Sequence, residues 1–314
     1  LLNDQKQIEY GKLVVATGSI LNKINTGCRE TNIYYLRTIT DALKIQQALK
    51  DKNKITIIGA GYIGLEIASI AVKKNIDITI IEMEDRVMSR VLCPVVSDFF
   101  QKKHEAEGVK FKFNVSVIDI EDSHNQKQIK CSDGTVMDTD AVVIGVGIKP
   151  NVELAINSGL VCQDGIVVDE NGQTSDKSIF AAGDCTSHPN SIYHKRLRLE
   201  SVHNAVEQAK SVAASISGEN KPYHQVPWFW SDQYNLKLQI AGISHNHDQY
   251  IIRGSMEEEK FTVFYLQKKK IVAVDTINNL QEFLNGKKLI AMDAEIPPEV
   301  LQNKDTNLKE WIKQ

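Results

Sequence analysis

Cysteine is scarce in this sequence and never occurs in close pairs. The 314 residues include five cysteines, and no two of them lie closer than 23 positions. No CxxC or CxxxxC pair occurs, which argues against a dithiol redox centre and against a zinc or iron–sulfur site in this chain. The odd count and the wide spacing predict reduced thiols that behave as small apolar residues.

Long apolar runs and a strong charge of one sign are also missing. The most apolar stretch, residues 55–72, contains three glycines and Glu66, so it is too short and too polar to span a bilayer. The first residues lack the basic region and apolar core of a signal peptide. A formal net charge of −3 gives no general attraction to nucleic acid or to anionic membranes. These absences predict a cytoplasmic protein with no membrane or nucleic-acid partner.

The length predicts two or three domains, and one strand–helix–strand unit is clear. Residues 54–58 and 76–81 are rich in β-branched residues, and the glycine-led segment 59–74 between them has a helical apolar period. Such a unit implies parallel strands joined by a right-handed crossover. Further elements follow it: a helix at 94–107, strands at 109–113 and 141–146, and a hairpin about Asp133-Gly134. We therefore predict a nucleotide-binding domain over residues 41–150.

The flanking segments predict two more domains. Short buried strands at 12–16 and 179–182 each end in a glycine turn, and residues 201–216 form an amphipathic helix. After Pro227 the pattern changes to alternating strands followed by helices, which is typical of an α+β domain. The predicted fold class is α/β, with two Rossmann-like three-layer nucleotide-binding domains and a C-terminal α+β domain. The second nucleotide-binding domain is split and incomplete (1–40 and 151–225), and the last domain covers 226–314.

The strongest motif is Gly59-Ala60-Gly61-Tyr62-Ile63-Gly64, a GxGxxG sequence between a predicted strand and a predicted helix. In a dinucleotide fold the first glycine permits the tight turn, the second lets a pyrophosphate approach, and the third lets helix and strand pack closely. The phosphates then lie at the helix N-terminus. Glu82 ends the next strand 23 residues after Gly59, where a carboxylate accepts hydrogen bonds from ribose and repels a 2′-phosphate. The motif predicts NADH as the coenzyme.

Glu66 stands two residues beyond the last glycine of the motif, on an otherwise apolar helix face. A buried carboxylate needs a partner. Glu66 either hydrogen-bonds the nicotinamide carboxamide or takes part in a cap or an interdomain salt bridge, and the sequence does not decide between them.

Two further strand ends point to a second nucleotide. Ala16-Thr17-Gly18 closes one predicted strand and Ala182-Gly183-Asp184 closes another, and they flank the complete nucleotide domain. This arrangement suggests a split flavin domain in which Asp184 accepts a hydrogen bond from the ribityl chain.

With these motifs the chain resembles the FAD-dependent ferredoxin reductases that serve bacterial oxygenases. The resemblance covers essentially the whole chain, and its most specific run is Pro227–Tyr234. The other matching stretches are Tyr35–Thr38, Gly59–Glu66, Pro94–Phe99, Asp164–Val168, Gly183-Asp184, Leu199–Val202 and Asn204-Ala205. The family begins with another GxGxxG unit that holds the ADP part of FAD, and we expect this sequence to lack that segment.

The resemblance implies roles for individual residues. Arg37, Asp184 and Val202 would touch FAD. Tyr62, Ile63 and Glu66 would face the nicotinamide, with Trp230 near the flavin edge where electrons leave. Glu66 and Trp230 are thus the predicted catalytic residues. The predicted cofactor-binding residues are Ala16, Thr17, Gly18, Arg37, Gly59, Gly61, Tyr62, Ile63, Gly64, Glu66, Glu82, Gly147, Gly183, Asp184 and Val202.

The implied reaction is hydride transfer from NADH to FAD, followed by single-electron transfer to a [2Fe–2S] ferredoxin. Lys210, and less strongly Arg196 and Arg198, are the expected contacts for an acidic ferredoxin. Alternatives with the same fold remain open: a rubredoxin reductase, an NADH oxidase, or an apoptosis-inducing-factor-like flavoprotein that works by binding partners.

Overall fold

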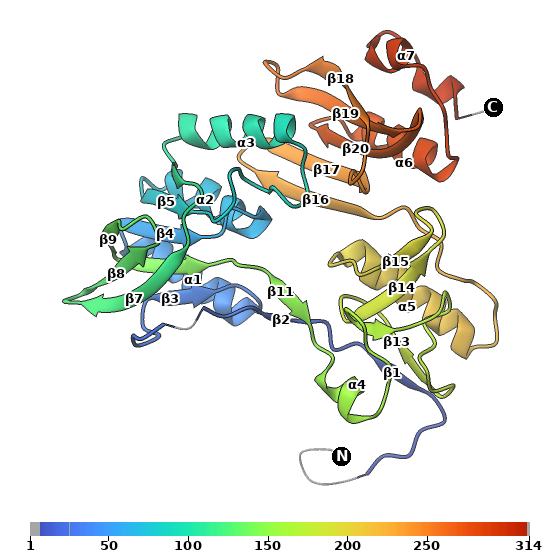
Figure 1. Ribbon diagram of the computed structural model, residues 1–314, viewed down its shortest axis with the longest axis horizontal. Helices are drawn as coiled ribbons and strands as arrows, with labels where there is room; N and C mark the ends of the chain where they lie inside the picture. Colours follow the sequence, from blue (N-terminus) through green and yellow to red (C-terminus); the bar gives the residue numbers. More distant parts are fainter. Residues whose placement is uncertain (1–6, 25, 313–314) are drawn as a thin grey trace.

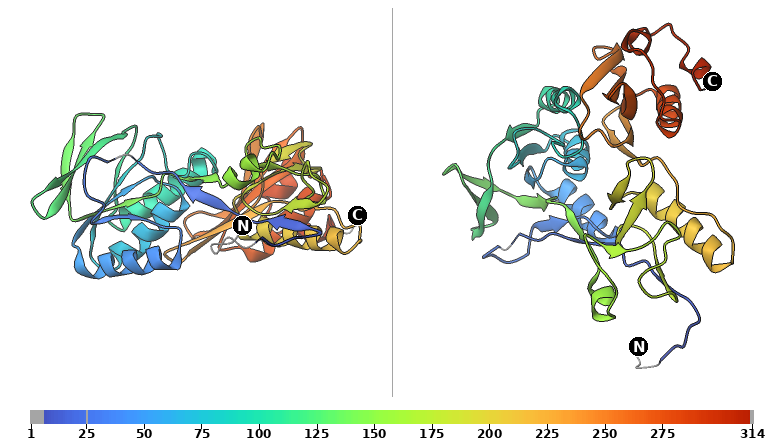
Figure 2. Two further views of the ribbon diagram at one scale, coloured as in Figure 1. Left: turned by 90° about the horizontal axis from the view of Figure 1, so that it is seen from below. Right: turned by 45° about the vertical axis from the view of Figure 1, so that its right-hand side comes forward.

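The protein, described here by a computed structural model over residues 7–24 and 26–312, has three lobes (Figure 1). The lobe drawn in blue to green holds the predicted nucleotide domain. The orange and red lobe contains the end of the chain, and a yellow-green lobe is joined by the dark-blue N-terminal segment. The right-hand view of Figure 2 shows the same division, whereas in the left-hand view the yellow-green lobe and the orange and red lobe overlap. The predicted α/β fold class with an added α+β domain is confirmed.

The first lobe is built on a five-stranded parallel sheet in the order β3-β10-β4-β5-β6. Its three inner strands, β10, β4 and β5, are almost wholly buried, as expected for a parallel sheet covered on both faces. Three helices flank the sheet. The bounds are β3 Ile33–Tyr35, α1 Ile39–Asp51, β4 Lys54–Ile58, α2 Tyr62–Val72, β5 Asp77–Ile81, α3 Pro94–Ala106, β6 Lys110–Lys112 and β10 Ala141–Ile144.

Local sequence explains where these helices begin. Thr38 caps α1, since its hydroxyl accepts the Asp41 N–H while the Asp41 carboxylate accepts from the Thr38 backbone. Pro94 starts α3, where its missing N–H costs nothing. Gly61 precedes α2, and no side chain caps that helix.

Two smaller sheets complete this lobe. The predicted hairpin is part of a three-stranded antiparallel sheet, β7 Val117–Ser123, β8 Gln126–Cys131 and β9 Val136–Thr139. An antiparallel ribbon of β2 (Ser19–Leu21) and β11 (Ile148–Pro150) leads towards the yellow-green lobe (Figure 1). The sequence had not indicated this ribbon.

Distant segments of the chain meet in the yellow-green lobe. β1 (Leu13–Val15) pairs in parallel with β13 (Ile179–Ala181), which brings the two parts of the predicted split domain side by side. β3, however, lies within the segment assigned to that domain, and it pairs with β10 of the nucleotide sheet. The strand β3 therefore belongs to the nucleotide sheet, although it precedes residue 41. The remaining elements are α4 Glu153–Asn157, β12 Ile166–Val167, β14 Thr186–Asn190, β15 Lys195–Leu197 and α5 Val202–Ile216.

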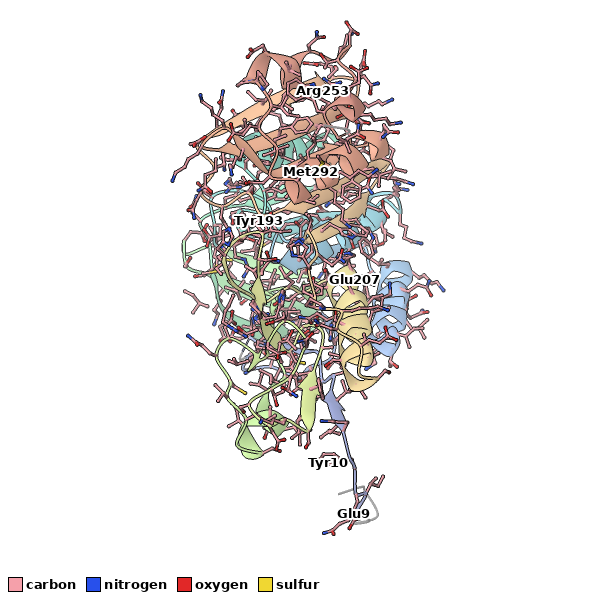
Figure 3. The ribbon with its side chains drawn as sticks, turned by 90° about the vertical axis from the view of Figure 1, so that its right-hand side faces the viewer. Glu9, Tyr10, Tyr193, Glu207, Arg253 and Met292 are labelled. Atoms are coloured by element: carbon pink, nitrogen blue, oxygen red, sulfur yellow. The ribbon has the colours of Figure 1, made fainter. Side chains whose placement is uncertain are left out.

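The last lobe is a five-stranded antiparallel sheet in the order β16-β17-β20-β19-β18, with helices on one side. Arg253, labelled in Figure 3, is buried and donates to the backbone carbonyls of Leu301, Lys304 and Thr306, which fastens α7 to the sheet. The bounds are β16 Trp228–Gln233, β17 Leu236–Gly242, β18 Gln249–Ser255, β19 Lys260–Gln267, β20 Lys270–Ile277, α6 Leu280–Ala291, α7 Pro298–Gln302 and a 3₁₀ turn Leu308–Glu310. β16 is a strand that the sequence analysis missed.

The first and last lobes share one hydrophobic core. Leu65 and Phe100 of the nucleotide lobe belong to the same buried cluster as Leu238 and Phe261 of the C-terminal lobe. The rings of Phe99 and Phe261 pack edge to face, with their centroids 4.9 Å apart. This shared core holds α2 and β16 together, and the candidate site depends on that contact. Within residues 7–24 and 26–312, no helix is both long and apolar enough to cross a membrane.

Candidate active site

Backbone contacts require glycine at two positions of the GxGxxG loop. Gly59 has a φ of +101°, and a Cβ there would lie 2.4 Å from the carbonyl oxygen of Gly145. A Cβ at Gly64 would lie 2.2 Å from the carbonyl oxygen of Gly59. The turn and the close packing of α2 on β4 therefore leave no space for a side chain.

Gly61 meets a different requirement. A Cβ at this position would have no heavy atom within 4 Å, so it would project into open space in front of α2. Because no side chain caps α2, the first N–H groups of the helix face that space with the positive end of the helix dipole. This arrangement fits a pyrophosphate.

Glu82 is held by the loop in front of it. Its Oε2 accepts the Ala60 N–H at 2.7 Å, and its Oε1 accepts the Glu84 N–H at 3.0 Å. Two backbone donors thus fix the carboxylate beside the glycine turn. A carboxylate has about four acceptor positions, so capacity remains for ribose hydroxyls.

Glu66 points from α2 towards the C-terminal lobe. Its Oε1 accepts a hydrogen bond from the Ser231 hydroxyl of β16 at 2.6 Å. Burial raises the pKa of Glu66, and the bond from Ser231 opposes that shift. The partner that a buried carboxylate needs is therefore a hydroxyl from another lobe, and not the cap or salt bridge considered from the sequence.

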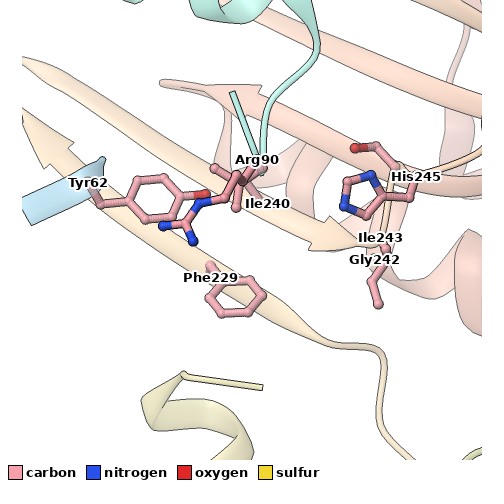
Figure 4. Close-up of a pocket in the computed structure, with 9 residues that line it drawn as sticks. Tyr62, Arg90, Phe229, Ile240, Gly242, Ile243 and His245 are labelled. Atoms are coloured by element: carbon pink, nitrogen blue, oxygen red, sulfur yellow. The ribbon is translucent and has the colours of Figure 1, made fainter. Parts of the chain in front are cut away.

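A cavity of about 110 Å³ lies between the first and last lobes (Figure 4). Tyr62, Arg90 and Phe229 line it together with the end of β17. Burial, reinforced by the nearby Asp275 and Glu66 carboxylates, raises the pKa of Tyr62, so its phenol stays neutral. Ile63, the next residue of α2, is exposed. The cavity thus begins at the first residue of α2, next to the glycine loop.

A second group of predicted residues gathers around Asp184. Its Oδ2 accepts a hydrogen bond from Ser19 at 2.8 Å and lies 3.9 Å from Nη2 of Arg37. A Cβ at Gly18 would stand 3.2 Å from the same Arg37 nitrogen. Thr17 donates to the Asn151 carbonyl at 2.6 Å. Strand ends that are far apart in sequence therefore form one polar cluster, and Ala16 lies exposed just before it.

The other predicted flavin-site residues border on this cluster. The Gly183 N–H donates to Gln208 of α5 at 2.8 Å. Val202, the first residue of α5, is 63% exposed. Gly147 has a φ of +88°, and a Cβ there would lie 3.5 Å from the Arg90 guanidinium. Arg90, which lies in the loop between β5 and α3, could not be identified from the sequence.

Trp230 projects from β16 and is 44% exposed. Its ring centroid lies 5.3 Å from that of Trp228, which in turn lies 5.4 Å from the imidazole of His203. Burial lowers the pKa of His203 to about 4, so this ring is uncharged at neutral pH. The rings of His203, Trp228 and Trp230 therefore form a row from the start of α5 to the exposed Trp230.

The three predicted basic contacts differ in availability. Lys210 is exposed and pairs with Glu207 on its own helix at 2.6 Å. Arg196 donates to the carbonyls of Val168 and Ser187. Arg198 pairs with Asp164 at 2.8 Å and also with Glu200. Both arginines are occupied within their own lobe, which leaves Lys210 as the strongest of the three candidates.

Comparison with known proteins shows the family of the chain. The sequence profile of the pyridine nucleotide-disulphide oxidoreductases matches residues 2–209, and that of the reductase C-terminal domain matches residues 228–312. Over 319 aligned residues the chain is 39% identical to putidaredoxin reductase CamA of Pseudomonas putida, which covers 99% of this chain and 76% of that protein.

Two solved structures are close in shape. One is a ferredoxin reductase for the CYP199A2 system from Rhodopseudomonas palustris, with a TM-score of 0.95 and 36% identity over 99% of this chain and 78% of that one. The other is the covalent putidaredoxin reductase–putidaredoxin complex, with a TM-score of 0.94 and 39% identity over 99% and 76%.

Proposed function

The chain belongs to the pyridine nucleotide-disulphide oxidoreductase family, and on that premise we propose that it passes electrons from NADH through FAD to a [2Fe–2S] ferredoxin. The family resemblance stated from the sequence is confirmed, and its members use FAD and NAD(P)H. The relatives named above include a reductase solved in complex with putidaredoxin. We also propose that the protein is located in the cytoplasm.

One observation carries the proposal most directly, namely the open space in front of α2. Gly61 leaves room for a pyrophosphate at the helix N-terminus, and Glu82 is fixed beside it as an acceptor for ribose. The negative charge of Glu82 disfavours a 2′-phosphate, so the preferred coenzyme is NADH.

The residues on the flavin side fit the group they would hold. Asp184, Arg37 and the backbone at Gly18 form a polar cluster that suits the ribityl chain and phosphates of FAD, and Val202 presents a helix end. When bound, FAD supplies the chemistry, since it takes up a hydride and gives up single electrons. Among the protein groups, Glu66 orients the nicotinamide and Tyr62 closes the cavity beside it.

Trp230 and Lys210 are the proposed contacts of the ferredoxin. Trp230 offers an exposed ring near the flavin edge, and Lys210 offers a cation to an acidic surface. Trp230 lies on β16 and Lys210 on α5, and these two elements are in contact.

The test compares electron acceptors with the FAD-loaded protein. We expect NADH to bleach the flavin rapidly, and we expect cytochrome c reduction to become fast only when putidaredoxin is added. A rubredoxin serves as the control acceptor, and faster transfer to it would favour the rubredoxin reductase alternative. Rapid oxygen consumption with neither acceptor would indicate an NADH oxidase. Slow bleaching with a stable charge-transfer complex would contradict the reductase and support a partner-binding flavoprotein.

A further inference from the structure

Glu66 is the end of a hydrogen-bonded chain that crosses from the nucleotide lobe to the C-terminal lobe and back. Ser231 bonds Glu66 at 2.6 Å, and Gln233 bonds Ser231 at 3.0 Å. The amide oxygen of Gln233 lies 2.8 Å from Nε2 of His104. The Tyr234 hydroxyl lies 2.9 Å from Nδ1 of the same ring. Ser231, Gln233 and His104 are fully buried.

With the Gln233 amide oriented as it is in the structure, the chemistry of the groups fixes the direction of every bond. The amide oxygen of Gln233 can only accept, so His104 must donate to it from Nε2. Nδ1 of His104 is then an acceptor, and Tyr234 donates to it. The amide nitrogen of Gln233 can only donate, so Ser231 accepts that bond and turns its own proton to Glu66. All four donors in the chain therefore point towards the carboxylate.

This arrangement requires a neutral imidazole, because a doubly protonated ring could not accept from Tyr234. Burial lowers the pKa of His104 to about 4, with Lys103 adding to the shift and Glu107 opposing it, so the ring is neutral at physiological pH. Burial also raises the pKa of Tyr234, which keeps its hydroxyl protonated and able to donate. With this orientation of the Gln233 amide, the chain is satisfied only in the direction that ends on the Glu66 carboxylate.

We propose that Ser231 is a positioning residue for the coenzyme: its hydroxyl, oriented by Gln233, His104 and Tyr234, holds Glu66 as a carboxylate turned to accept from the nicotinamide carboxamide. The inference rests on the proposed function, and it adds that the C-terminal lobe contributes to recognition of the nicotinamide. A carboxylate that accepts one bond from Ser231 keeps acceptor capacity for an amide N–H. Without that bond, Glu66 would be free to turn, and burial would favour its protonated form.

Two ligands separate this role from simple structural support. Tetrahydro-NAD is a non-reducing analogue of NADH that keeps the carboxamide, and ADP-ribose lacks the nicotinamide altogether. We expect the Ser231→Ala variant of the FAD-loaded full chain to bind tetrahydro-NAD about tenfold more weakly in isothermal titration calorimetry. Its affinity for ADP-ribose should stay within twofold of wild type, because the glycine loop and Glu82 are untouched.

Three further variants complete the design. Glu66→Gln should reproduce the selective loss, and Ser231→Thr, which restores the hydroxyl, should recover most of the affinity. The matched control is Ser255→Ala, since Ser255 donates to the exposed carboxylate of Glu257 at 2.9 Å in the same sheet. This control should bind both ligands as wild type does.

The outcomes distinguish the inference from the proposed function. If wild type binds neither ligand, the proposed coenzyme site itself is wrong. If Glu66→Gln loses tetrahydro-NAD selectively while Ser231→Ala binds it normally, the coenzyme site stands and the positioning role is overturned. A Ser231→Ala variant that loses both ligands equally would also overturn it, because the effect would then be a general loss of structure.

Discussion

The carboxylate of Glu82 accepts the backbone N–H of Ala60, one residue into the glycine turn. The Glu82 carboxylate, which would bind the ribose, is therefore held by the same loop that would bind the pyrophosphate. Substitution of either part should disturb the other.

For Glu82 we consider a change to glutamine, which keeps the size of the side chain but removes its charge. The amide nitrogen cannot accept from a backbone N–H or from a ribose hydroxyl, so we expect the Kd of NADH to rise about tenfold, the size of one hydrogen bond to a charged group. The ratio of NADPH to NADH affinity should increase. Glu84→Gln, at an exposed neighbouring carboxylate, is the control. An unchanged ratio would show that Glu82 does not discriminate between the coenzymes.

The glycines at 61 and 64 should respond to alanine in opposite ways. At Gly64 the new methyl would meet the Gly59 carbonyl, so we expect the fold to lose about 3 kcal/mol or more. At Gly61 the methyl meets no protein atom, so thermal unfolding should be unchanged while ADP-ribose binds at least tenfold more weakly. Melting curves and calorimetric titration measure the two effects. A Gly61→Ala variant with normal affinity would mean that no pyrophosphate approaches this turn.

Arg253 should be a major source of stability in the C-terminal lobe. It is buried and lies 3.2 Å from Glu282, whose pKa burial raises. Arg253→Met would leave that carboxylate and several carbonyls without their donor, and we expect a loss of about 3–5 kcal/mol in urea unfolding. The control Arg29→Ala breaks an exposed pair with Asp122 and should cost less than about 1 kcal/mol. Adding Glu282→Leu to Arg253→Met should recover part of the loss.

The buried, neutral His104 should make the folded protein less stable in mild acid. Burial holds its folded-state pKa at about 4, below the usual 6.5, so the unfolded chain binds a proton that the folded chain rejects. Its contribution is therefore fully present above pH 6.5 and is lost as the pH falls towards 4, by about 3 kcal/mol in total. Urea unfolding at several pH values should show a smaller acid loss in His104→Gln than in wild type. Equal slopes would mean that His104 is not buried as a neutral ring.

The nucleotide lobe could be predicted closely because its signals are local. β-branched strands, a glycine turn and a helical apolar period occur together between residues 54 and 81, and each feature requires only neighbouring residues. The GxGxxG motif and Glu82 were found from the sequence for the same reason. Their roles in binding stay predictions.

β16 was missed because its burial pattern is the reverse of its hydropathy. Ser231 and Gln233 are buried, whereas Trp230 is substantially exposed, so no apolar alternation marks the strand. The partner of Glu66 was also out of reach, since Ser231 lies 165 positions away and only the folded chain brings them together. The ribbon of β2 and β11 depends on similarly distant pairing.

The apolar contact between Phe99 and Phe261 limits how this protein can be divided. A fragment that starts at residue 226 would contain Phe261 without α3, the helix that covers it. The apolar face of its sheet would then be exposed to water. We expect such a fragment to be recovered in inclusion bodies. A fragment that begins before α3 keeps the helix that covers the sheet.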